Sequence, residues 1–288
     1  MAGKVVPLEE ALDLVADGNT VGLGGMTLYR RPMAAVRGLI RRKVRDLTVV
    51  SFAGSIETDM LIGAGSVAKV RCCYLGMEFL GLAPNFRRAV EGGALEVVEE
   101  TELTLGGALL ASMQRSTFHA VRELLETDIL KVRSDLKVTA CPITGVPVVA
   151  IPALHLDVAI IHVQKADRYG NAQIVGQLCI DKQLAAVAQK VILTAEKIVD
   201  TEEIVNHPAK AQIVNFDVDA VVRVPFGAHP TSCYPYYTLD VPHLQEYVDC
   251  ASAGQFDKYL EKYVWGAASH EEYMENVGGV RTVFLLLL

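Results

Sequence analysis

The stretch from Thr20 to Pro32 joins a short apolar strand, a glycine pair and the start of a helical pattern. It reads TVGLGGMTLYRRP, with Gly24 and Gly25 directly after the apolar residues. Glycines at the end of a strand allow a sharp turn and let a ligand approach backbone N–H groups. A strand, a glycine turn and a helix together form the usual site-building unit of α/β proteins. A tight turn without a ligand is the alternative, because a single glycine cluster is a weak signal.

Short β-rich runs alternate with helical patterns along the N-terminal part of the chain. The expected strands are Thr20–Leu23, Leu47–Phe52, Val70–Leu75 and Leu95–Glu99, and the expected helices are Met33–Lys43, Glu57–Gly63 and Asn85–Gly92. This alternation predicts an α/β fold with an open, mostly parallel sheet flanked by helices. Continuous apolar strands such as the run VVSF fit a sheet that is covered on both faces.

The rest of the chain carries helical and β-rich patterns in a less regular order. A long helical pattern runs from Glu102 to Arg115, and residues 119–137 have helical character with mixed charge. The elements expected after them are strands in PVVAIPA, DVAIIHVQKA and NAQIVG, a helix at Asp181–Gln189, strands at Val191–Ala195 and Asp219–Val224, and helices from Asp240 onward. No Pro/Ser-rich linker and no internal repeat interrupts the sequence, so we expect one continuous domain over residues 1–288.

Composition and charge exclude several classes of function. The chain is 51% hydrophobic, which is enough to bury a large core, and its net charge of −7 argues against nucleic-acid binding. The basic run Arg37–Arg45 fits the solvent face and the C-terminal end of the first long helix. The N-terminus does not resemble a signal peptide, and the final FLLLL, which fits a terminal strand or an exposed tail, is too short to span a membrane.

The cysteines and histidines give no metal pattern. The six cysteines lack zinc spacing, so we expect reduced thiols, mostly in the core, in a cytoplasmic protein. No His/Asp/Glu set has metal spacing either, and no metal site is predicted. His155 and His162 lie in or beside apolar strands and are expected to be satisfied core groups.

Three further segments place polar groups where predicted strands end. Residues 224–244 read VPFGAHPTSCYPYYTLDVPHL, an irregular aromatic-rich loop that serves either a site or its own packing. This loop contains Gly227 and His229, and His229 is the best histidine candidate for hydrogen bonding in a site. The other segments are the polar turn Asp167–Asn171 and the carboxylates of Glu99, Glu100 and Glu102 before the long helical pattern.

Taken together, these segments resemble the family I CoA-transferases, specifically the A subunit of the glutaconate CoA-transferase group. The similar stretches, collinear over nearly the whole chain, are VGLGGMTLYRRPMAAV, DLTVVSFAG, DMLIGAGSVAKV, NFRRAVEGG, VPVVAIPALHLDVAIIHVQKADRYGNAQI and VDAVVRVPFGAHPTSCYPYY. The resemblance implies an open α/β subunit that pairs with a B subunit, as a heterodimer or heterotetramer. Its substrates would be an acyl-CoA and a carboxylic acid, with the coenzyme A thioester as substrate and no permanently bound cofactor.

The resemblance also implies how the two subunits share the site. In these transferases a glutamate of the B subunit forms an acyl anhydride and then a glutamyl-CoA thioester. The A subunit is expected to supply part of the wall and some of the donors that stabilise the oxyanion. The residues expected to bind substrate or CoA are Gly24, Gly25, Met26, Glu78, Asn171, Gly227 and His229. Met26 stands where the family's loop more usually carries an aromatic residue.

Glu102 distinguishes two reactions on this scaffold. Glutaconate-type transferases carry an amide at the matching position. A related branch, the hydrolases that open the last steroid ring of cholesterol as a CoA thioester, carries a glutamate there and lacks the B-subunit glutamate. By resemblance to that branch, Glu102 is expected to be a general base whose pKa is raised by burial. The alternative is a carboxylate that only stabilises a helix N-terminus, and Glu99 and Glu100 are expected to be solvated or capping groups.

Two positions depart from these relatives. The hydrolase branch has a glycine-rich segment where residues 122–128 read RELLETD. Glu78 is a candidate for the same pocket, where it would repel a dicarboxylate substrate, and a surface position is the alternative. Three functions therefore stay open: the A subunit of a CoA-transferase, the A subunit of a CoA-thioester hydrolase or lyase with Glu102 as base, and a non-catalytic scaffold whose glycine loop only packs against a partner.

Overall fold

The larger of two sheets is built mainly from parallel strands. A computed structural model of the chain describes residues 3–207 and 211–279. The parallel strands run in the order β12 (Ala220–Arg223), β10 (Ala188–Val199), β8 (Leu156–Asp167), β1 (Thr20–Leu23), β2 (Leu47–Gly54), β3 (Val67–Leu75) and β4 (Glu96–Glu99). Antiparallel β9 (Ala172–Gln173) follows β8 and pairs with β11 (Ala211–Ile213), which completes nine strands within the described residues. The predicted α/β class is confirmed.

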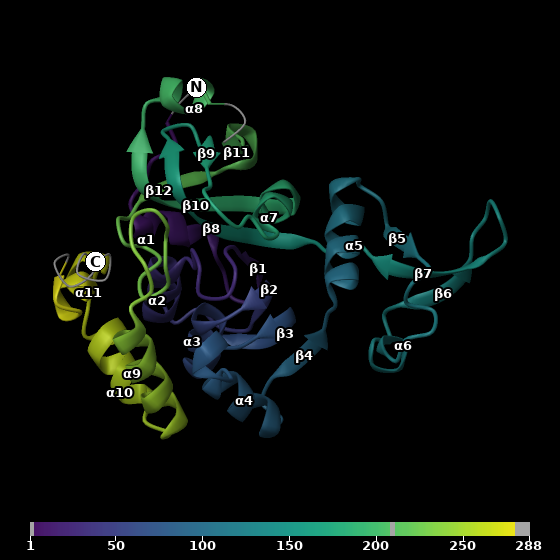
Figure 1. Cartoon of the computed structure of the whole chain (residues 1–288), viewed down its shortest axis with the longest axis horizontal. Coiled ribbons are helices and arrows are strands. Elements are labelled where there is room, and N and C mark those ends of the chain that lie inside the picture. Colours follow the sequence, from purple (N-terminus) through teal and green to yellow (C-terminus); the bar gives the residue numbers. More distant parts are fainter. Residues whose placement is uncertain (1–2, 208–210, 280–288) are drawn as a thin grey trace.

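Helices cover both faces of this sheet (Figure 1). One face carries α2 (Met33–Arg41), α3 (Ile56–Gly63), α4 (Pro84–Glu91), α9 (Val241–Ser252), α10 (Phe256–Leu260) and α11 (His270–Asn276), and the other face carries α5 (Glu102–Met113) and α7 (Asp181–Val187). Short α1 (Leu8–Ala11) packs beside β12, and α8 (Thr201–Val205) follows β10. Along β8, Val158 and Ile160 join one hydrophobic cluster whereas Ala159 and Ile161 join the other. This alternation explains why the strand reads as continuously apolar.

A smaller antiparallel sheet lies on the far side of α5 (Figure 1). It consists of β5 (Phe118–Val121), β7 (Pro147–Pro152) and β6 (Lys137–Ala140), and α6 (Ile129–Val132) lies between β5 and β6 in sequence. The helical character expected for residues 119–137 is therefore wrong over most of that stretch. Both β5 and β6 pair with β7, which comes later in the chain, so the local pattern does not reveal them. The single continuous domain expected from the sequence stays a prediction.

The basic run Arg37–Arg45 is not a solvent face throughout, because Arg37 is only 1% exposed. Its guanidinium lies 3.5 Å from the ring centre of Tyr273, and Nη1 donates to the carbonyl of His229 at 3.1 Å. Its Nη2 lies 3.3 Å from Nδ1 of His270. Burial lowers the pKa of Arg37. Packing of α11 against α2 buries this side chain, and sequence periodicity in α2 alone does not show it.

Several boundaries differ from expectation at the ends of elements. The helix expected at Asp181–Gln189 ends at Val187, because β10 begins at Ala188 and continues to Val199. The strand expected in NAQIVG is reduced to Ala172–Gln173. The FLLLL segment lies outside the described residues. Within the described part of the chain, no helix is both long and apolar enough to cross a membrane.

The strand order reverses between β1 and β8. The chain continues outward from β1 through β2, β3 and β4, and outward on the other side from β8 through β10 and β12. The two strands are parallel neighbours in the register Val21 to Val158 and Leu23 to Ile160. In open α/β sheets, ligands bind outside the carboxyl ends of the strands at such a reversal. The glycine loop after β1 lies at this position.

Candidate functional site

The glycine loop closes on its own chain. The N–H of Gly24 donates to the carbonyl of Ile160 at 3.0 Å, that of Gly25 to Asp181 Oδ1 at 2.8 Å, and that of Met26 to the carbonyl of Tyr29 at 3.0 Å. Gly25 has a φ of +84°, and a Cβ there would lie 2.5 Å from the carbonyl oxygen of Tyr29. The turn therefore requires glycine for its own geometry. Because the three N–H groups are used within the chain, they are not the free donors expected from the sequence, and a binding role for the loop stays a prediction.

A buried ion pair lies beside this loop. Arg30 Nη2 contacts Asp181 Oδ2 at 2.5 Å, and both side chains are fully buried. Arg30 also donates through Nη1 to the carbonyl of His162 at 2.8 Å and through Nη2 to the carbonyl of Gln177 at 2.6 Å. These bonds connect the loop after β1 with β8 and with the start of α7. The ion pair fixes the position of the glycine turn, since Asp181 also accepts the Gly25 N–H.

A second buried ion pair joins the loop to β2 and α3. Arg31 Nε lies 3.3 Å from Glu57 Oε2, and both side chains are fully buried. Arg31 donates to the carbonyl of Thr27 at 2.8 Å and to that of Gly24 at 3.1 Å. Burial lowers the pKa of Arg31, and the charge of Glu57 partly opposes that shift. Removing one partner would leave a buried charge without compensation, which typically costs about 3–5 kcal/mol.

Sequence reasoning missed both ion pairs. Arg30 and Arg31 follow the glycine pair directly, and adjacent arginines in such a loop are the only local signal. Asp181, the partner of Arg30, lies 151 residues further on, and Arg31 pairs with Glu57 from another element. Buried charges are rare unless paired, so the pairing had to be seen in the folded chain.

Backbone strain gathers around the same edge of the sheet. Non-glycine residues with positive φ include Thr27 (45°) and Arg30 (54°) after β1, Glu78 (54°) after β3, Cys179 (51°) before α7 and Phe226 (58°) after β12. Each such conformation costs on the order of 1–3 kcal/mol and persists only where the surrounding structure holds it. Strain of this kind is typical of binding and catalytic sites. The carboxyl edge of the sheet is therefore the candidate site on grounds independent of the glycine loop.

Glu102 lies at this edge, as the first residue of α5. Thr101 caps the helix, since its hydroxyl accepts the N–H of Thr104 at 3.1 Å. Glu102 is exposed in this chain, so the burial expected at this position is not observed. Its charge acts on the partly buried thiol of Cys73, whose pKa is raised to about 12 by burial and by several anions, Glu100 foremost and Glu102 among them. Glu102 and Cys73 are thus neighbours, and the role of Glu102 as a base stays a prediction.

Glu100 is a buried structural carboxylate. Oε1 accepts from Arg71 Nε at 2.9 Å, and Oε2 accepts from Arg133 Nη1 at 2.7 Å. The expectation of a solvated or capping Glu100 is therefore wrong, whereas Glu99 is exposed. Two arginines, one from β3 and one from the segment after α6, hold Glu100 between the two sheets. Arg71 and Arg133 also line a cleft of about 520 Å³ beside β4.

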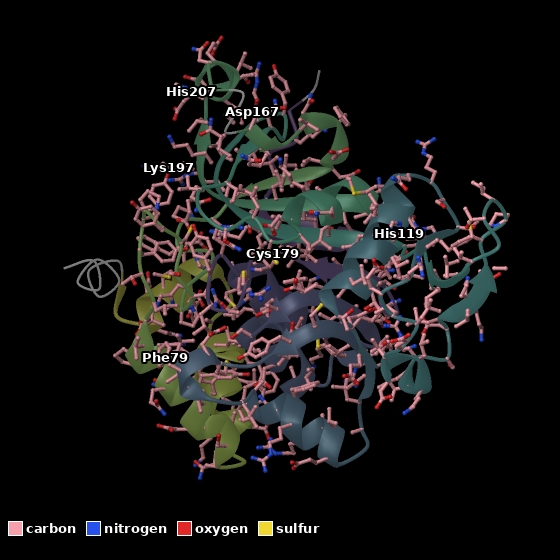
Figure 2. The ribbon with its side chains drawn as sticks, turned by 45° about the vertical axis from the view of Figure 1, so that its right-hand side comes forward. Phe79, His119, Asp167, Cys179, Lys197 and His207 are labelled. Atoms are coloured by element: carbon pink, nitrogen blue, oxygen red, sulfur yellow. The ribbon has the colours of Figure 1, made fainter. Side chains whose placement is uncertain are left out.

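Glu78 is exposed in a turn with several exposed apolar neighbours. Tyr74, Phe79 and Leu82 are 43%, 65% and 68% exposed. In Figure 2, Cys179 lies near the centre of the molecule and Phe79 lies toward the lower left. The position of Glu78 fits both alternatives that the sequence left open, a surface residue and a group facing a shared pocket. The apolar residues around Glu78 form an exposed hydrophobic patch.

His229 and Gly227 belong to the packed interior. His229 is 1% exposed, with Nδ1 2.7 Å from the Tyr273 hydroxyl and Nε2 2.9 Å from Asp240 Oδ2. Burial lowers the pKa of His229. A Cβ on Gly227 would lie 2.8 Å from the carbonyl oxygen of Val224. Both residues shape the loop after β12 from inside, and their expected role in binding substrate stays a prediction.

The remaining predicted groups also bind within the chain. Asn171 donates to Asp167 Oδ2 at 2.7 Å and accepts the N–H of Asn215 at 3.1 Å, which closes the turn after β8. His162 is a fully buried, hydrogen-bonded core group as predicted, whereas His155 is exposed and that expectation is wrong. The six cysteines are free, as expected, but only Cys72 and Cys233 are buried.

Comparison with known proteins agrees with this architecture. The family model for coenzyme A transferase matches residues 5–224. The chain is 33% identical to the A subunit of glutaconate CoA-transferase from Acidaminococcus fermentans, over 98% of its own length and 94% of that protein. The crystal structure of that organism's glutaconate coenzyme A-transferase superposes with a TM-score of 0.92 at 31% identity, covering 98% of this chain and 95% of that one.

Two other relatives broaden the comparison. A protein of Archaeoglobus fulgidus is 40% identical over 97% of this chain, which spans only 63% of that protein's length. A cholesterol ring-cleaving hydrolase subunit of Rhodococcus jostii is 33% identical over 95% of each chain. One scaffold therefore occurs in relatives named for transfer and in relatives named for hydrolysis.

Proposed function

Because the chain belongs to the coenzyme A transferase family and corresponds to its A subunits, we propose that it acts as the A subunit of a heteromeric CoA-transferase. It would move CoA between an acyl-CoA and a carboxylic acid, with the glutamate nucleophile supplied by a B subunit. The observation that carries this proposal is the nearly full-length structural match to glutaconate CoA-transferase. The predicted family and enzyme class are confirmed, and the substrates and the partner belong to the proposal.

Three buried carboxylates beside the candidate site are unavailable as nucleophiles, which fits a nucleophile on another chain. Asp181, Glu57 and Glu100 each bind an arginine in the interior. A carboxylate held in this way stabilises the fold and cannot reach an acyl group. A covalent transfer needs a carboxylate that can approach the thioester carbonyl beside donors for the oxyanion. A glutamate from the B subunit, placed against the carboxyl edge, meets that requirement.

The surface at this edge supports docking of a partner. Exposed apolar side chains follow β3 (Phe79, Leu82) and lie in the loop after β12 (Tyr234, 66% exposed). Apolar surface next to strained, polar loops is typical of a site completed by association. In the proposed complex these residues pack against the B subunit, and Met26 and Glu78 face the acyl group.

Hydrolysis is the second candidate, and the position of Glu102 favours it. Glu102 is exposed at the N-terminus of α5 and can accept a proton from a water molecule. The water oxygen would attack the thioester carbonyl while Glu102 takes the proton, and the CoA thiolate would then leave and be protonated. The relative named as a cholesterol ring-cleaving hydrolase subunit supports such chemistry on this scaffold.

A thioester screen of the complex distinguishes the two candidates. The chain is co-expressed with a candidate B subunit, and acyl-CoAs are incubated with and without carboxylic acids. Formation of a new acyl-CoA only when a carboxylic acid is present, with labelled CoA attached to the B subunit, supports transfer. Loss of acyl-CoA to free CoA without an acceptor supports hydrolysis. A purified complex that does neither across the screen overturns the proposal.

The variant Glu102→Gln assigns the role of the carboxylate. For transfer, Glu102→Gln retains most of the exchange rate, because the nucleophile lies on the B subunit. For hydrolysis, it loses the rate that a general base supplies, typically about 10²–10⁴-fold. Glu99→Gln is the matched control, because Glu99 is also exposed and lies three residues earlier. Full hydrolysis by Glu102→Gln would rule out Glu102 as the base.

A further inference from the structure

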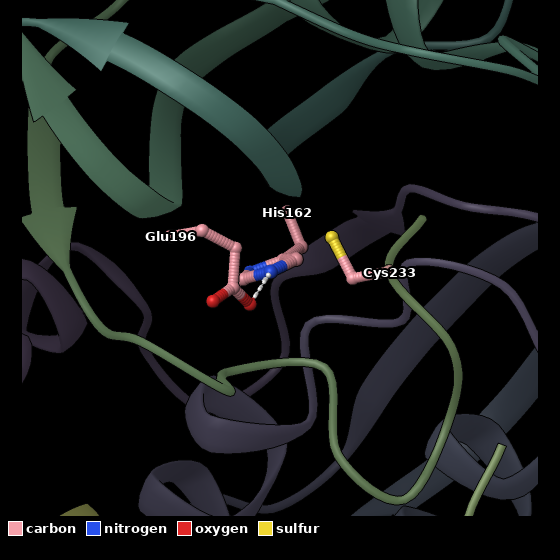
Figure 3. A group of neighbouring side chains, drawn as sticks. All are labelled: His162, Glu196 and Cys233. Carbon is pink, nitrogen blue, oxygen red and sulfur yellow. Dashed lines mark hydrogen bonds and ion pairs between the residues drawn. The ribbon is translucent and has the colours of Figure 1, made fainter. Parts of the chain in front are cut away.

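A histidine, a glutamate and a cysteine meet in the interior, outside the groups discussed for the acyl site. His162 lies on β8, Glu196 on β10 and Cys233 in the loop after β12. Their side chains converge in Figure 3, and one ligand atom from each of the three residues lies within 4.8 Å of the other two. The exposed fractions of the three residues are 0%, 5% and 0%. Three different ligand types therefore meet in one small, buried region of the interior.

The donor set suits zinc. Zn²⁺ prefers imidazole nitrogen, thiolate sulfur and carboxylate oxygen in tetrahedral geometry. A thiolate and a carboxylate together carry two negative charges, which one Zn²⁺ balances beside a neutral histidine. Burying a net charge carries a large desolvation penalty, so a site in the interior is more stable when the charges of metal and ligands cancel. The separation of His162 Nε2 and Glu196 Oε1, 2.8 Å, requires only a small opening for a shared metal.

The groups around the cluster orient each ligand. Thr194 Oγ1 lies 2.9 Å from Nδ1 of His162, so it can accept the Nδ1–H when Nε2 binds a metal. Phe226 donates its N–H to Oε2 of Glu196 at 2.7 Å, which leaves Oε1 for the cluster. The Tyr237 hydroxyl donates to Oε1 and supplies a fourth ligand atom at the same place.

The loop after β12 is shaped to bring these groups together. Phe226 adopts a φ of +58°, and this conformation aims its N–H at Glu196. A Cβ on Gly227 would lie 2.9 Å from Cε1 of His162, so only glycine lets the loop cross the imidazole this closely. The loop then returns past Cys233, whose N–H binds the carbonyl of Tyr237 at 3.0 Å.

We propose that His162, Glu196 and Cys233 bind one structural Zn²⁺, with the Tyr237 hydroxyl as the fourth ligand. Binding forms the Zn–S bond and releases the thiol proton to solvent, while the imidazole moves its remaining proton from Nε2 to Nδ1. The metal fastens residues 224–237 to the ends of β8 and β10, beside the candidate site. The proposed site differs from the sequence-based expectation of no metal. Spacing along the chain does not reveal it, because His162 and Glu196 lie 34 residues apart and are brought together by the parallel pairing of β8 with β10.

Metal analysis of the purified full chain tests the proposal. The chain is incubated with excess Zn²⁺, freed of loose metal by gel filtration and analysed by mass spectrometry. We expect one zinc ion per chain in the wild type and in Cys72→Ala, which removes a buried cysteine elsewhere on β3. We expect zinc to be lost in Cys233→Ala. Wild-type protein without bound zinc, or undiminished zinc in Cys233→Ala, overturns the site.

Two further measurements keep the test decisive if Cys233→Ala fails to fold. Wild-type protein loaded with Co²⁺ should show a sulfur-to-cobalt charge-transfer band, and the absence of that band overturns thiolate ligation. Thr194→Val should weaken Zn²⁺ binding roughly 10–100-fold in competition with a chelator, because the imidazole loses the group that orients it. An unchanged affinity in Thr194→Val overturns the proposed orientation of His162.

Discussion

Asp59 is a fully buried carboxyl group on α3 that should make the stability of this chain depend on pH. Its Oδ1 accepts the N–H of Phe86 at 2.7 Å, and its Oδ2 accepts from Asn85 Nδ2 at 3.1 Å and from the Tyr247 hydroxyl at 2.6 Å. Burial raises the pKa of Asp59 from 3.8 to about 6, although these three hydrogen bonds oppose the shift. The carboxyl connects α3 with α4 and α9, so its ionisation acts on the packing of three helices.

The sign and size of the effect follow from the two pKa values. The folded chain holds the Asp59 proton more tightly than the unfolded chain, so this group's contribution is fully present below about pH 4. It is lost as the pH rises through about 6. Each pKa unit corresponds to about 1.4 kcal/mol, and the shift of about two units therefore corresponds to about 3 kcal/mol. Tyr247 stays neutral throughout, because burial raises its pKa well above the usual value.

The variant Asp59→Asn isolates this contribution from every other titrating group. The free energy of unfolding is measured by urea denaturation at intervals from pH 4 to pH 8 for the wild type and the variant. We expect the advantage of the wild type to fall by about 3 kcal/mol between pH 4 and pH 7 and then to level off. Asp257→Asn, which alters an exposed carboxylate on α10, is the control and should show little change. A wild-type advantage that is constant across this range would refute the reasoning.

Three further substitutions test the packing inferred for the interior, each by urea denaturation at neutral pH. Gly25→Ala should lower the free energy of unfolding by about 3 kcal/mol, because the new Cβ meets a carbonyl oxygen. Gly65→Ala is the control, since Gly65 has a φ of +74° but open space around it, and should cost about 1 kcal/mol. Equal losses in the two variants would contradict the clash. Arg133→Ala should cost about 2 kcal/mol of unfolding free energy, because buried Glu100 then keeps only one of its two arginine partners. Adding Glu100→Gln should recover part of this loss, and no recovery would contradict a charge left partly uncompensated. Arg37→Met should stay within about 1 kcal/mol of the wild type whereas Arg37→Ala should cost about 3 kcal/mol, because the partners of Arg37 among the described residues are neutral. Equal losses would show that the charge itself matters.

Local periodicity predicted the first half of the sheet because each strand there is followed by its own helix. From β1 to β4 the strand and helix patterns lie in series, and each expected element overlaps the observed one. The pattern fails at β5 and β6, whose side chains are mostly exposed and whose partner β7 lies later in the chain. A strand without a buried face leaves no alternation to read, so only the pairing reveals it.

The charged groups were harder to predict for a different reason. Arginine and glutamate are surface residues by composition, so Arg31, Arg37 and Glu100 carry no sign of burial in the sequence. Their positions depend on partners from elements far along the chain, such as Glu57 for Arg31 and α11 for Arg37. The sequence predicted the strand that precedes the glycine loop, but the position of that strand at the reversal of strand order is known only from the structure. The sequence could not show that the loop's N–H groups are used internally, because Asp181 comes from α7.

These internal bonds change what the glycine loop can contribute to a CoA-thioester site. Arg30 and Arg31 lie in the loop's own sequence, and their ion pairs to Asp181 and Glu57 hold its backbone from the protein side. A loop fixed in this way is a rigid wall, and the groups that it can present to a substrate are side chains such as Met26, which is half-buried. Rigid positioning of that kind is what a site shared with a second chain requires, because each chain must hold its half before they meet. Differences in acyl preference within the family would then arise from positions such as Met26 and Glu78 and from the B subunit, and the glycines would preserve the shape of the wall.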